Sequence, residues 1–357
     1  MPNFHLVTIL IWLIFTALVF LGFTLVAASR YRDGVFQHEK DFPVLIILPC
    51  RGVDYRFEEN LKALREIEYK HYRIVAVVDD MNDPSVPYLR SAGIEIAVSR
   101  AECSECSGKV RAIATILEID IDEEIIVVLD SDTMVGKKWL YYLTEPFNDY
   151  KIGVTTTFPV FVADGGFWSV IKTAWGMVGS GMMESKITRF VWGGSMAFRK
   201  SLITNESLQF FKKNVSDDVA IMRICKNAGF NIEYVKKAAP KIYSNEGRND
   251  FIEWSNRQTA LSVSGSPAVL KYGIIFYVLD IFLLISAILL SIFVYPLFIL
   301  FTLPYFLTAI KNARRSITRK AAVFAITFIT PFFYLSNLII ASRMRSIKWR
   351  GRSYGLP

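Results

Sequence analysis

The stretch Glu124-Ile125-Ile126-Val127-Val128-Leu129-Asp130-Ser131-Asp132 decides the fold of this chain. Its five apolar residues, bounded by acids, are typical of a strand buried on both faces, as in a parallel sheet. Open α/β sheets bind ligands beyond the carboxyl ends of their strands, which is where Asp130 and Asp132 fall. Two carboxylates so close together offer hard oxygen ligands to Mg²⁺ or Mn²⁺, ions that bridge diphosphate oxygens. An ordinary polar turn would use the same residues, because Asp is favoured in turns, so the neighbouring segments must decide.

Strand-and-helix units surround this stretch. Residues 43–48, 73–78 and 94–98 are short apolar runs that predict strands, and helical patterns follow at 57–67 and 110–119. Strands that alternate with helices of this length predict an α/β fold, a doubly wound and mainly parallel sheet with right-handed crossovers.

Acidic side chains gather at one edge of the predicted sheet. Asp79 and Asp80 follow the strand at 73–78, as Asp130 and Asp132 follow theirs. Four acids on one edge require a cation or hydrogen-bond donors, and a nucleoside diphosphate with its metal would supply both. The alternative is that these acids cap the helices that follow, which is common.

The apolar excess lies at the two ends of the chain. Of 357 residues, 52% are hydrophobic, and the mean hydropathy is +0.33. Residues 6–29 carry no charge, and roughly 24 residues suffice to cross a bilayer. Arg30 and Arg32 follow this segment rather than precede it, which favours an uncleaved anchor over a signal peptide and places its C-terminal side in the cytoplasm.

The net charge of +8 does not point to nucleic acid. The basic residues cluster at 311–320 and 343–352, beside the apolar ends, so anionic lipid headgroups are the expected partner. The four cysteines form no disulfide framework, and we expect them to be reduced in the cytoplasm, with Cys103 and Cys106 in a plain loop. None of the three histidines lies near an acidic cluster, so a general base would be a carboxylate.

Two features of the second half carry candidate chemistry. The paired glycines after Trp192 allow close backbone approach, so Gly193 and Gly194 predict a binding loop. Ser216 precedes Asp217 and Asp218 at the start of an apolar-periodic helix. A Ser cap followed by two acids is a good helix start; the functional alternative is a general base.

The segment between these features and the membrane is rich in Trp and Met. Residues 165–190 contain several glycines and predict a poor isolated helix. Their Trp and Met side chains suit either core packing or an apolar groove for a lipid acceptor. Beyond them, Arg257 lies on a predicted amphipathic helix, where it could pair with a diphosphate or with a lipid headgroup.

The C-terminal part predicts membrane segments. Residues 274–293 are long enough to span, and 295–310 form a short return. A further crossing at 321–341 would place the basic tail outside, against the positive-inside rule. Pro331 permits a kinked or re-entrant segment, so we expect the tail to stay cytoplasmic. Asp280 is a candidate functional site within its span or, equally, a contact with the interfacial part.

The order of these motifs resembles the membrane-bound inverting glycosyltransferases of the GT-A fold, family 2 and its ceramide glucosyltransferase-like relatives. The resemblance covers roughly residues 40 to 265, and the tail Trp349-Arg350-Gly351-Arg352-x-Tyr354 also looks like theirs. It rests on this ordered set: Asp79-Asp80, Gly108-Lys109, Asp130-Ser131-Asp132, Gly193-Gly194-Ser195-x-x-x-Arg199, Asp217-Asp218 and Trp254-x-x-Arg257-Gln258.

The resemblance implies roles for single residues. Asp132, supported by Asp130, would hold Mg²⁺ or Mn²⁺, and Asp218 would be the catalytic base, with Asp217 beside it and Arg257 contacting the leaving group. The implied donor-binding residues are Asp79, Asp80, Lys109, Asp130 and Gln258; the implied acceptor-binding residues are Trp192, Gly193 and Trp254. The last motif departs from the family pattern, because Trp254 replaces its first member and Gln258 its final Trp, which argues against a processive polymerase.

The expected organisation follows from both arguments. We expect an N-terminal transmembrane anchor at 1–32, a GT-A (Rossmann-like) catalytic domain at 40–245, interfacial helices at 246–272, transmembrane segments at 273–342 and a basic tail at 343–357. The predicted function is metal-dependent transfer of a hexose from a nucleotide sugar, expected to be UDP-linked, to a lipid hydroxyl. The alternatives are transfer to a polyprenyl phosphate and, outside enzymes, a membrane transporter or scaffold. The catalytic domain would face the cytoplasm, at the plasma membrane in a prokaryote.

Overall fold

The computed structural model describes residues 2–28, 31–36, 40–103 and 105–356. The chain divides into two compact units. The sheet unit comprises Arg32–Phe161, Met182–Ser244 and Arg345–Pro357; the helical unit comprises Met1–Tyr31, Val162–Gly181 and Asn245–Met344. Each unit is thus assembled from segments that lie far apart in the sequence.

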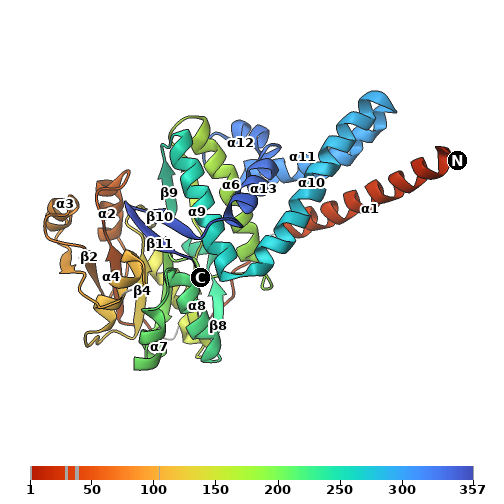
Figure 1. The fold of residues 1–357 in the computed structure, drawn as a ribbon. Helices are drawn as coiled ribbons and strands as arrows, with labels where there is room; N and C mark the ends of the chain where they lie inside the picture. The colour runs from red at the N-terminus through yellow and green to blue at the C-terminus, as the bar shows by residue number, and fades with distance from the viewer. Residues whose placement is uncertain (1, 29–30, 37–39, 104, 357) are drawn as a thin grey trace. The chain divides into compact units, whose positions relative to one another are not determined.

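A seven-stranded sheet forms the centre of the sheet unit, in the order β3-β2-β1-β4-β7-β5-β8 (Figure 1). Strands β1 to β4 pair in parallel, as the alternating pattern predicts, and β5 and β8 are also parallel to each other. The α/β class with a mainly parallel sheet is therefore confirmed. The strands are β1 (Val44–Pro49), β2 (Tyr72–Val78), β3 (Glu95–Val98), β4 (Ile125–Leu129), β5 (Ile152–Thr156), β7 (Ser195–Arg199) and β8 (Asn231–Tyr234).

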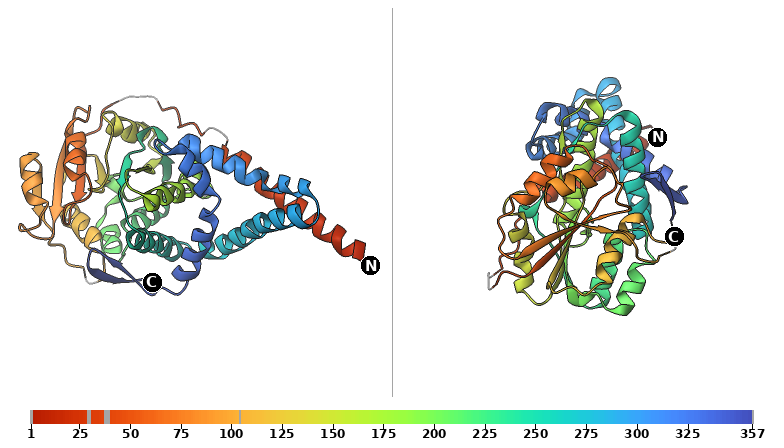
Figure 2. Two further views of the ribbon diagram at one scale, coloured as in Figure 1. Left: turned by 90° about the horizontal axis from the view of Figure 1, so that it is seen from above. Right: turned by 90° about the vertical axis from the view of Figure 1, so that its left-hand side faces the viewer.

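The sheet is covered on both faces, which explains its continuous apolar strands (Figure 2). In β1, Val44 and Ile46 pack into one core with helices α2, α3 and α5, and Leu45 and Ile47 pack into a second core with α4, α7 and α8. All five residues of β4 are buried. The helices are α2 (Phe57–Arg65), α3 (Val86–Ser91), α4 (Gly108–Leu117), α5 (Trp139–Thr144), α7 (Asn205–Phe211) and α8 (Asp217–Asn227).

Strand β7 was not predicted. Gly193 and Gly194, which predict a binding loop, lie in a turn, and the residues after them, Ser195–Arg199, form a strand antiparallel to both β4 and β5. Met196, Ala197 and Phe198 are fully buried. The run is short, and its strand character depends on two neighbours far away in the sequence, so the local pattern was not enough to predict it.

Smaller elements lie outside the seven-stranded sheet. Short 3₁₀ turns lie at Glu145–Asn148, Lys200–Leu202 and Lys236–Ala238. Strands β6 (Val160–Ala163) and β9 (Lys241–Ser244) form a two-stranded sheet. The C-terminal tail folds into an antiparallel hairpin of β10 (Ser346–Trp349) and β11 (Arg352–Gly355), and its two turn residues Arg350 and Gly351 have φ of 47° and 76°.

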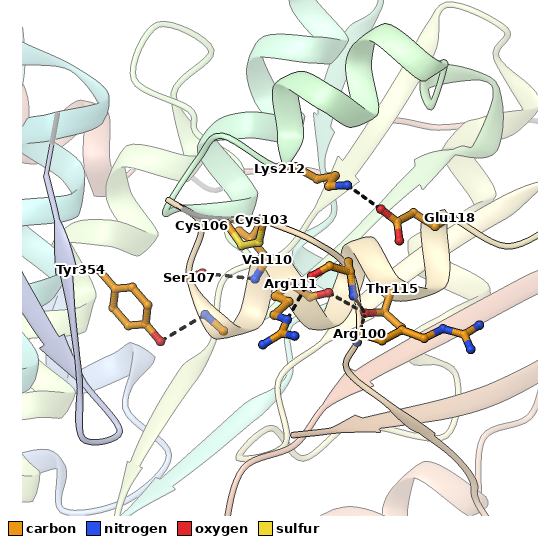
Figure 3. The surroundings of a disulfide bond; sticks show 12 residues. Arg100, Cys103, Cys106, Ser107, Val110, Arg111, Thr115, Glu118, Lys212 and Tyr354 are labelled. Atoms are coloured by element: carbon orange, nitrogen blue, oxygen red, sulfur yellow. Dashed lines mark hydrogen bonds and ion pairs between the residues drawn. A yellow bond between two sulfur atoms is a disulfide. The ribbon is translucent and has the colours of Figure 1, made fainter. Parts of the chain in front are cut away.

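The loop before α4 contains a disulfide between Cys103 and Cys106 (Figure 3). The sequence predicted reduced thiols here, and the structure differs. The turn brings the two Cα atoms to 5.7 Å, within the usual range for bonded cysteines. Cys50 and Cys225 are buried free thiols.

The helical unit carries the apolar ends of the chain. Within the part of the chain that the structure describes, two segments are long and apolar enough to span a membrane, Pro267–Phe293 and Pro296–Arg315, and the pair Lys320–Thr327 and Thr330–Ala341 is bent by 60°. Residues 2–28 form one helix, and Leu10–Gly22 is an apolar stretch within it. The elements are α1 (Pro2–Ala28), α6 (Phe167–Glu184), α9 (Arg248–Gly265), α10 (Pro267–Phe293), η4 (Pro296–Thr302), α11 (Leu303–Arg315), α12 (Lys320–Thr327) and α13 (Thr330–Ala341).

Helix α6 is continuous despite the glycines that predicted a poor helix. Val170, Ile171 and Ala174 are buried in the core of the helical unit, and Trp168 stacks on Phe251 with ring centroids 5.9 Å apart. Tertiary packing therefore outweighs the low helix propensity of glycine. Core packing, one of the two alternatives for this segment, accounts for these aromatic side chains.

Candidate active site

The loop after β4 presents Asp130 and Asp132 at the carboxyl end of the sheet, as predicted. The backbone N–H of Asp130 donates to Gly194 O at 3.1 Å, which ties the loop to the start of β7. The Asp130 side chain is one-third exposed, at 33%. Thr133 Oγ1 donates to Asp132 Oδ1 at 3.2 Å. Both carboxylates are held by neighbouring donors and remain open to solvent on one side.

Lys109 links this loop to Asp217, the neighbour of the predicted base Asp218. Its ammonium lies 2.7 Å from Asp130 Oδ1 and 3.0 Å from Asp217 Oδ2, and it donates to Gly193 O at 3.0 Å. Only 8% of the side chain is exposed. Burial acts to lower the pKa of Lys109, but Asp130 and Asp217 together raise it above its ordinary value, so the ammonium stays charged.

Asp217 is the buried member of the acidic pair. It opens helix α8, and 9% of its side chain is exposed. Burial raises the pKa of Asp217 to about 6, with Asp218 and Asp130 adding to the effect and Lys109 opposing it. The position of Asp217 between Lys109 and the protein interior suits a residue that orients its neighbours.

Asp218 lies at the mouth of the same helix and is half-buried. Its Oδ2 accepts from the Gly193 N–H at 3.1 Å, and its Oδ1 accepts from the Val219 N–H at 2.8 Å and from Ser216 Oγ. A carboxylate has about four acceptor positions, so these three bonds orient the group and leave capacity for one further donor. Ser216 occupies the N-cap position of α8 as predicted, but its side chain caps no backbone N–H; its hydroxyl donates to Asp218 instead.

Gly193 is required by this arrangement. A Cβ at this position would lie 2.7 Å from Asp217 Oδ2 and 3.0 Å from Lys109 Nζ. The carboxylate and the ammonium therefore pack directly on the glycine backbone. Trp192, next to it, is half-buried and packs on Phe158 with ring centroids 6.0 Å apart.

The two acids after β2 occupy different environments. Asp79 Oδ2 lies between two guanidinium groups, 3.5 Å from Arg51 Nε and 3.2 Å from Arg352 Nη2. Asp80 is exposed, and its Oδ1 accepts from the Asn82 N–H at 2.7 Å. Of the pair, Asp80 is thus the more accessible to a ligand. The sequence interpretation missed both arginines, because neither spacing nor motif connects them to Asp79.

The residues of the acidic edge suit a divalent cation that is shared with a substrate. Within the described parts of the chain, no group of three or more His, Cys, Asp or Glu side chains is arranged to hold an ion. Asp130 and Asp132 provide two hard oxygen donors, and Mg²⁺ in particular is commonly bound by one or two carboxylates with phosphates and water. The donor set therefore fits such an ion only together with a phosphate-bearing ligand.

The remaining predicted site residues lie on α9 in the helical unit. The Trp254 ring packs against Trp175, with centroids 4.9 Å apart, and lies 4.5 Å from Lys172 Nζ. Arg257 and Gln258 are half-buried further along the same helix. The buried Asn337 of α13 donates to Asn256 Oδ1 at 2.7 Å, which fixes α9 within its unit. The roles predicted for Trp254, Arg257 and Gln258 stay predictions.

Known proteins similar to the chain are glycosyltransferases. Residues 9–357 match the sequence model of glycosyl transferase family 21. No curated protein matches the chain. Mannosyltransferase PcManGT from Pyrobaculum calidifontis, solved in complex with GDP-Man and Mn2+, has a TM-score of 0.55 at 16% identity, and the match covers 94% of this chain and 96% of that one. At this identity, the match shows a shared fold.

A second solved structure is more distant. Glucosyl-3-phosphoglycerate synthase from Mycobacterium tuberculosis, in complex with Mn2+, uridine-diphosphate and glucosyl-3-phosphoglycerate, has a TM-score of 0.42 at 13% identity. The match covers 63% of this chain and 80% of that one. A similarity this low carries no structural argument.

Proposed function

Because the chain belongs to glycosyl transferase family 21, we propose that it transfers a hexose from a UDP-sugar to a lipid hydroxyl at the membrane, with inversion at the anomeric carbon. Family membership confirms that the chain is a glycosyltransferase, and assigns it to family 21 where its motifs also resembled family 2. The observation that carries the proposal is the position of Lys109, whose ammonium contacts both Asp130 and Asp217. Lys109 therefore connects the loop of Asp130 and Asp132, the proposed metal ligands, to helix α8, which bears the proposed base Asp218.

A divalent cation is part of the proposal. Asp132 and Asp130 would hold Mg²⁺ or Mn²⁺, which would neutralise negative charge on the departing nucleoside diphosphate. Support comes from the two carboxylates on one loop and from the Mn2+ in the complex of the mannosyltransferase that shares the fold. Asp80, exposed at the same edge, is the proposed contact to the nucleoside.

Asp218 is the proposed general base. It would accept the proton of the acceptor hydroxyl as that oxygen attacks the anomeric carbon and the C–O bond to the diphosphate breaks. Bonds from Gly193 N–H and Val219 N–H fix its orientation, and the carboxylate keeps the capacity to accept one further hydrogen bond. Arg257 would add positive charge at the leaving group, as the resemblance implies.

A lipid acceptor is supported by the apolar helices. Two segments have the length and composition to span, and a third, the α12–α13 pair, is bent. The tail after α13 belongs to the sheet unit and contacts its loops, so the tail and the catalytic residues share one side of the membrane. We propose that α10 and the Pro296–Arg315 segment cross, and that the bent pair is re-entrant. The basic residues flanking these segments favour the cytoplasm for that side.

Transfer to a polyprenyl phosphate is the second candidate within enzymes. A phosphate oxygen is already ionised and requires little base assistance, so the two acceptors differ in how strongly they depend on Asp218. The buried polar contacts that orient Asp218 favour the hydroxyl acceptor, because an acceptor without a proton to lose would not require an oriented carboxylate.

The proposal is tested on the full-length protein in detergent with native lipids. UDP-sugars and GDP-mannose are screened for Mn²⁺-dependent hydrolysis, and the lipid extract is then analysed by mass spectrometry for an added hexose. We expect one donor to be hydrolysed only with metal, and one lipid class to gain the mass of a single hexose residue. A folded protein that binds no nucleoside diphosphate with Mn²⁺ would contradict the proposal and favour a transporter or scaffold.

A further inference from the structure

The C-terminal hairpin contacts loops that are nearly the whole chain away in sequence. Arg352 Nη2 lies 3.2 Å from Asp79 Oδ2, directly after β2. The Tyr354 hydroxyl accepts from the N–H of Gly108, the first residue of α4, at 3.2 Å (Figure 3). A Cβ at Gly108 would lie 3.2 Å from Arg352 Nη1 and 3.3 Å from the Tyr354 hydroxyl. Strand β11 of the hairpin is therefore anchored at the acidic edge of the sheet.

Arg350, at the turn itself, contacts the loop after β1. Its Nη1 donates to the backbone oxygen of Arg51, and its Nη2 lies 2.5 Å from Asp54 Oδ1. The residue has φ of 47°, a left-handed conformation that is unfavourable for a non-glycine residue. The same residue therefore combines the left-handed turn conformation with the two guanidinium contacts.

Asp54 connects Arg350 to the loop that contains Asp130 and Asp132. Ser131 Oγ donates to Asp54 Oδ2 at 2.5 Å, so one carboxylate binds the tail through one oxygen and the loop through the other. Asn60 Nδ2 donates to the Ser131 backbone oxygen at 3.1 Å. Ser131 is 6% exposed and lies between Asp130 and Asp132. An unbroken chain of hydrogen bonds thus runs from the tail to the residue between the two metal ligands.

We propose that Arg350 is a positioning residue of the active site, which holds the loop of Asp130 and Asp132 in its metal-binding conformation through Asp54 and Ser131. The inference rests on the proposed function, in which this loop binds the metal ion. It makes the last residues of the chain a structural part of the donor site.

Two effects of Arg350 have opposite signs and must be separated. Asp132 and Asp130 lie close enough to act on the guanidinium electrostatically, so removing its charge would by itself favour a bound cation. Loss of positioning would instead weaken cation binding. Ser131→Ala breaks the same chain of hydrogen bonds without changing any charge, and therefore isolates the positioning effect.

The first measurement is amide hydrogen exchange on the full-length protein in detergent, with no ligand added. Arg350→Ala and Ser131→Ala should each raise exchange about tenfold at Thr133 and Met134, whose N–H groups bond Asp130 O and Lys241 O. Lys348→Ala is the matched control, because Lys348 is exposed on the same hairpin. Unchanged exchange at these amides in Arg350→Ala would overturn the inference. If that variant does not fold, Ser131→Ala decides through the exchange of residues 346–355, which should also rise.

The second measurement is Mn²⁺ affinity, from the free-ion EPR signal with UDP or GDP present. Ser131→Ala should weaken Mn²⁺ binding about tenfold, and Arg350→Ala combined with it should be no weaker than Ser131→Ala alone. Wild-type affinity in Ser131→Ala would show that Arg350 acts only as a charge, against the inference. If the wild-type protein itself binds neither nucleotide with Mn²⁺, the proposed function fails, while the exchange experiment still decides the positioning role.

Discussion

The ammonium of Lys109 lies 3.0 Å from Asp217 Oδ2, and both side chains are more than 90% buried. Lys109 comes from the start of α4 and Asp217 from the start of α8, so this ion pair fixes the distance between the N-termini of the two helices. Removing one partner of a buried pair leaves the other charge uncompensated, which typically costs about 3–5 kcal/mol.

Lys109→Met should therefore destabilise the protein by about 3–5 kcal/mol, since Asp130 and Asp217 would both lose their cation. Thermal unfolding in detergent measures the effect, and Lys62→Met, an exposed lysine on α2, is the control that should change little. Equal midpoints for the two variants would show that the buried pair contributes no stability.

Gly193→Ala tests the close packing beneath this pair. The added methyl would approach Asp217 Oδ2 to 2.7 Å, so either the carboxylate or the backbone must move, at a cost of about 1–3 kcal/mol. Gly136→Ala adds the same methyl where nothing lies within 4 Å. We expect a lower unfolding midpoint and lower transferase activity only in Gly193→Ala; matching losses in both variants would contradict the packing argument.

The sequence predicted the features that depend on residues close together in the chain, and it missed those that depend on contacts between distant segments. Asp130, Asp132 and Asp80 could be placed at one edge because each follows an apolar strand, and the rule for parallel sheets brings strand ends together. The contact of Lys109 with Asp217 and the pairing of strand β7 join segments that are distant in the sequence, and hydrophobic periodicity carries no information about such contacts. The tail could be matched to a family pattern, but only the folded hairpin brings Arg350 to Asp54.

The protonation of Asp217 should make the stability of the protein depend on pH. Its pKa is raised by burial from 3.8 to about 6, so between these values the folded protein binds more protons than the unfolded chain. Stability from this group is present below about pH 4 and is lost as the pH rises to 6, by at most about 3 kcal/mol. Denaturant titrations at several pH values should show the wild-type protein losing stability relative to Asp217→Asn across this window. A constant or opposite difference would contradict the raised pKa.

Asp132→Asn should remove the proposed metal dependence while the fold is kept. The amide is a poorer ligand for a hard cation than a carboxylate, and Asp132 is half-buried at the surface of the loop. We expect Mn²⁺ affinity in the presence of nucleoside diphosphate to fall at least about tenfold, with the unfolding midpoint within a degree or two. Asp122→Asn, an exposed acid before β4, serves as the control. Unchanged affinity in Asp132→Asn would move the metal site elsewhere.

Asp218→Asn separates the two acceptor chemistries. The amide keeps the shape of the carboxylate and accepts through its oxygen from the Gly193 N–H, but it cannot take a proton. Base assistance is worth about 10²–10⁴-fold, so turnover with a lipid hydroxyl should fall by that factor while Mn²⁺-dependent binding of the donor stays within about threefold. With a polyprenyl phosphate as acceptor, the same variant should lose little, because the attacking oxygen carries no proton at neutral pH. Near-wild-type transfer to a hydroxyl acceptor would show that Asp218 is not the base.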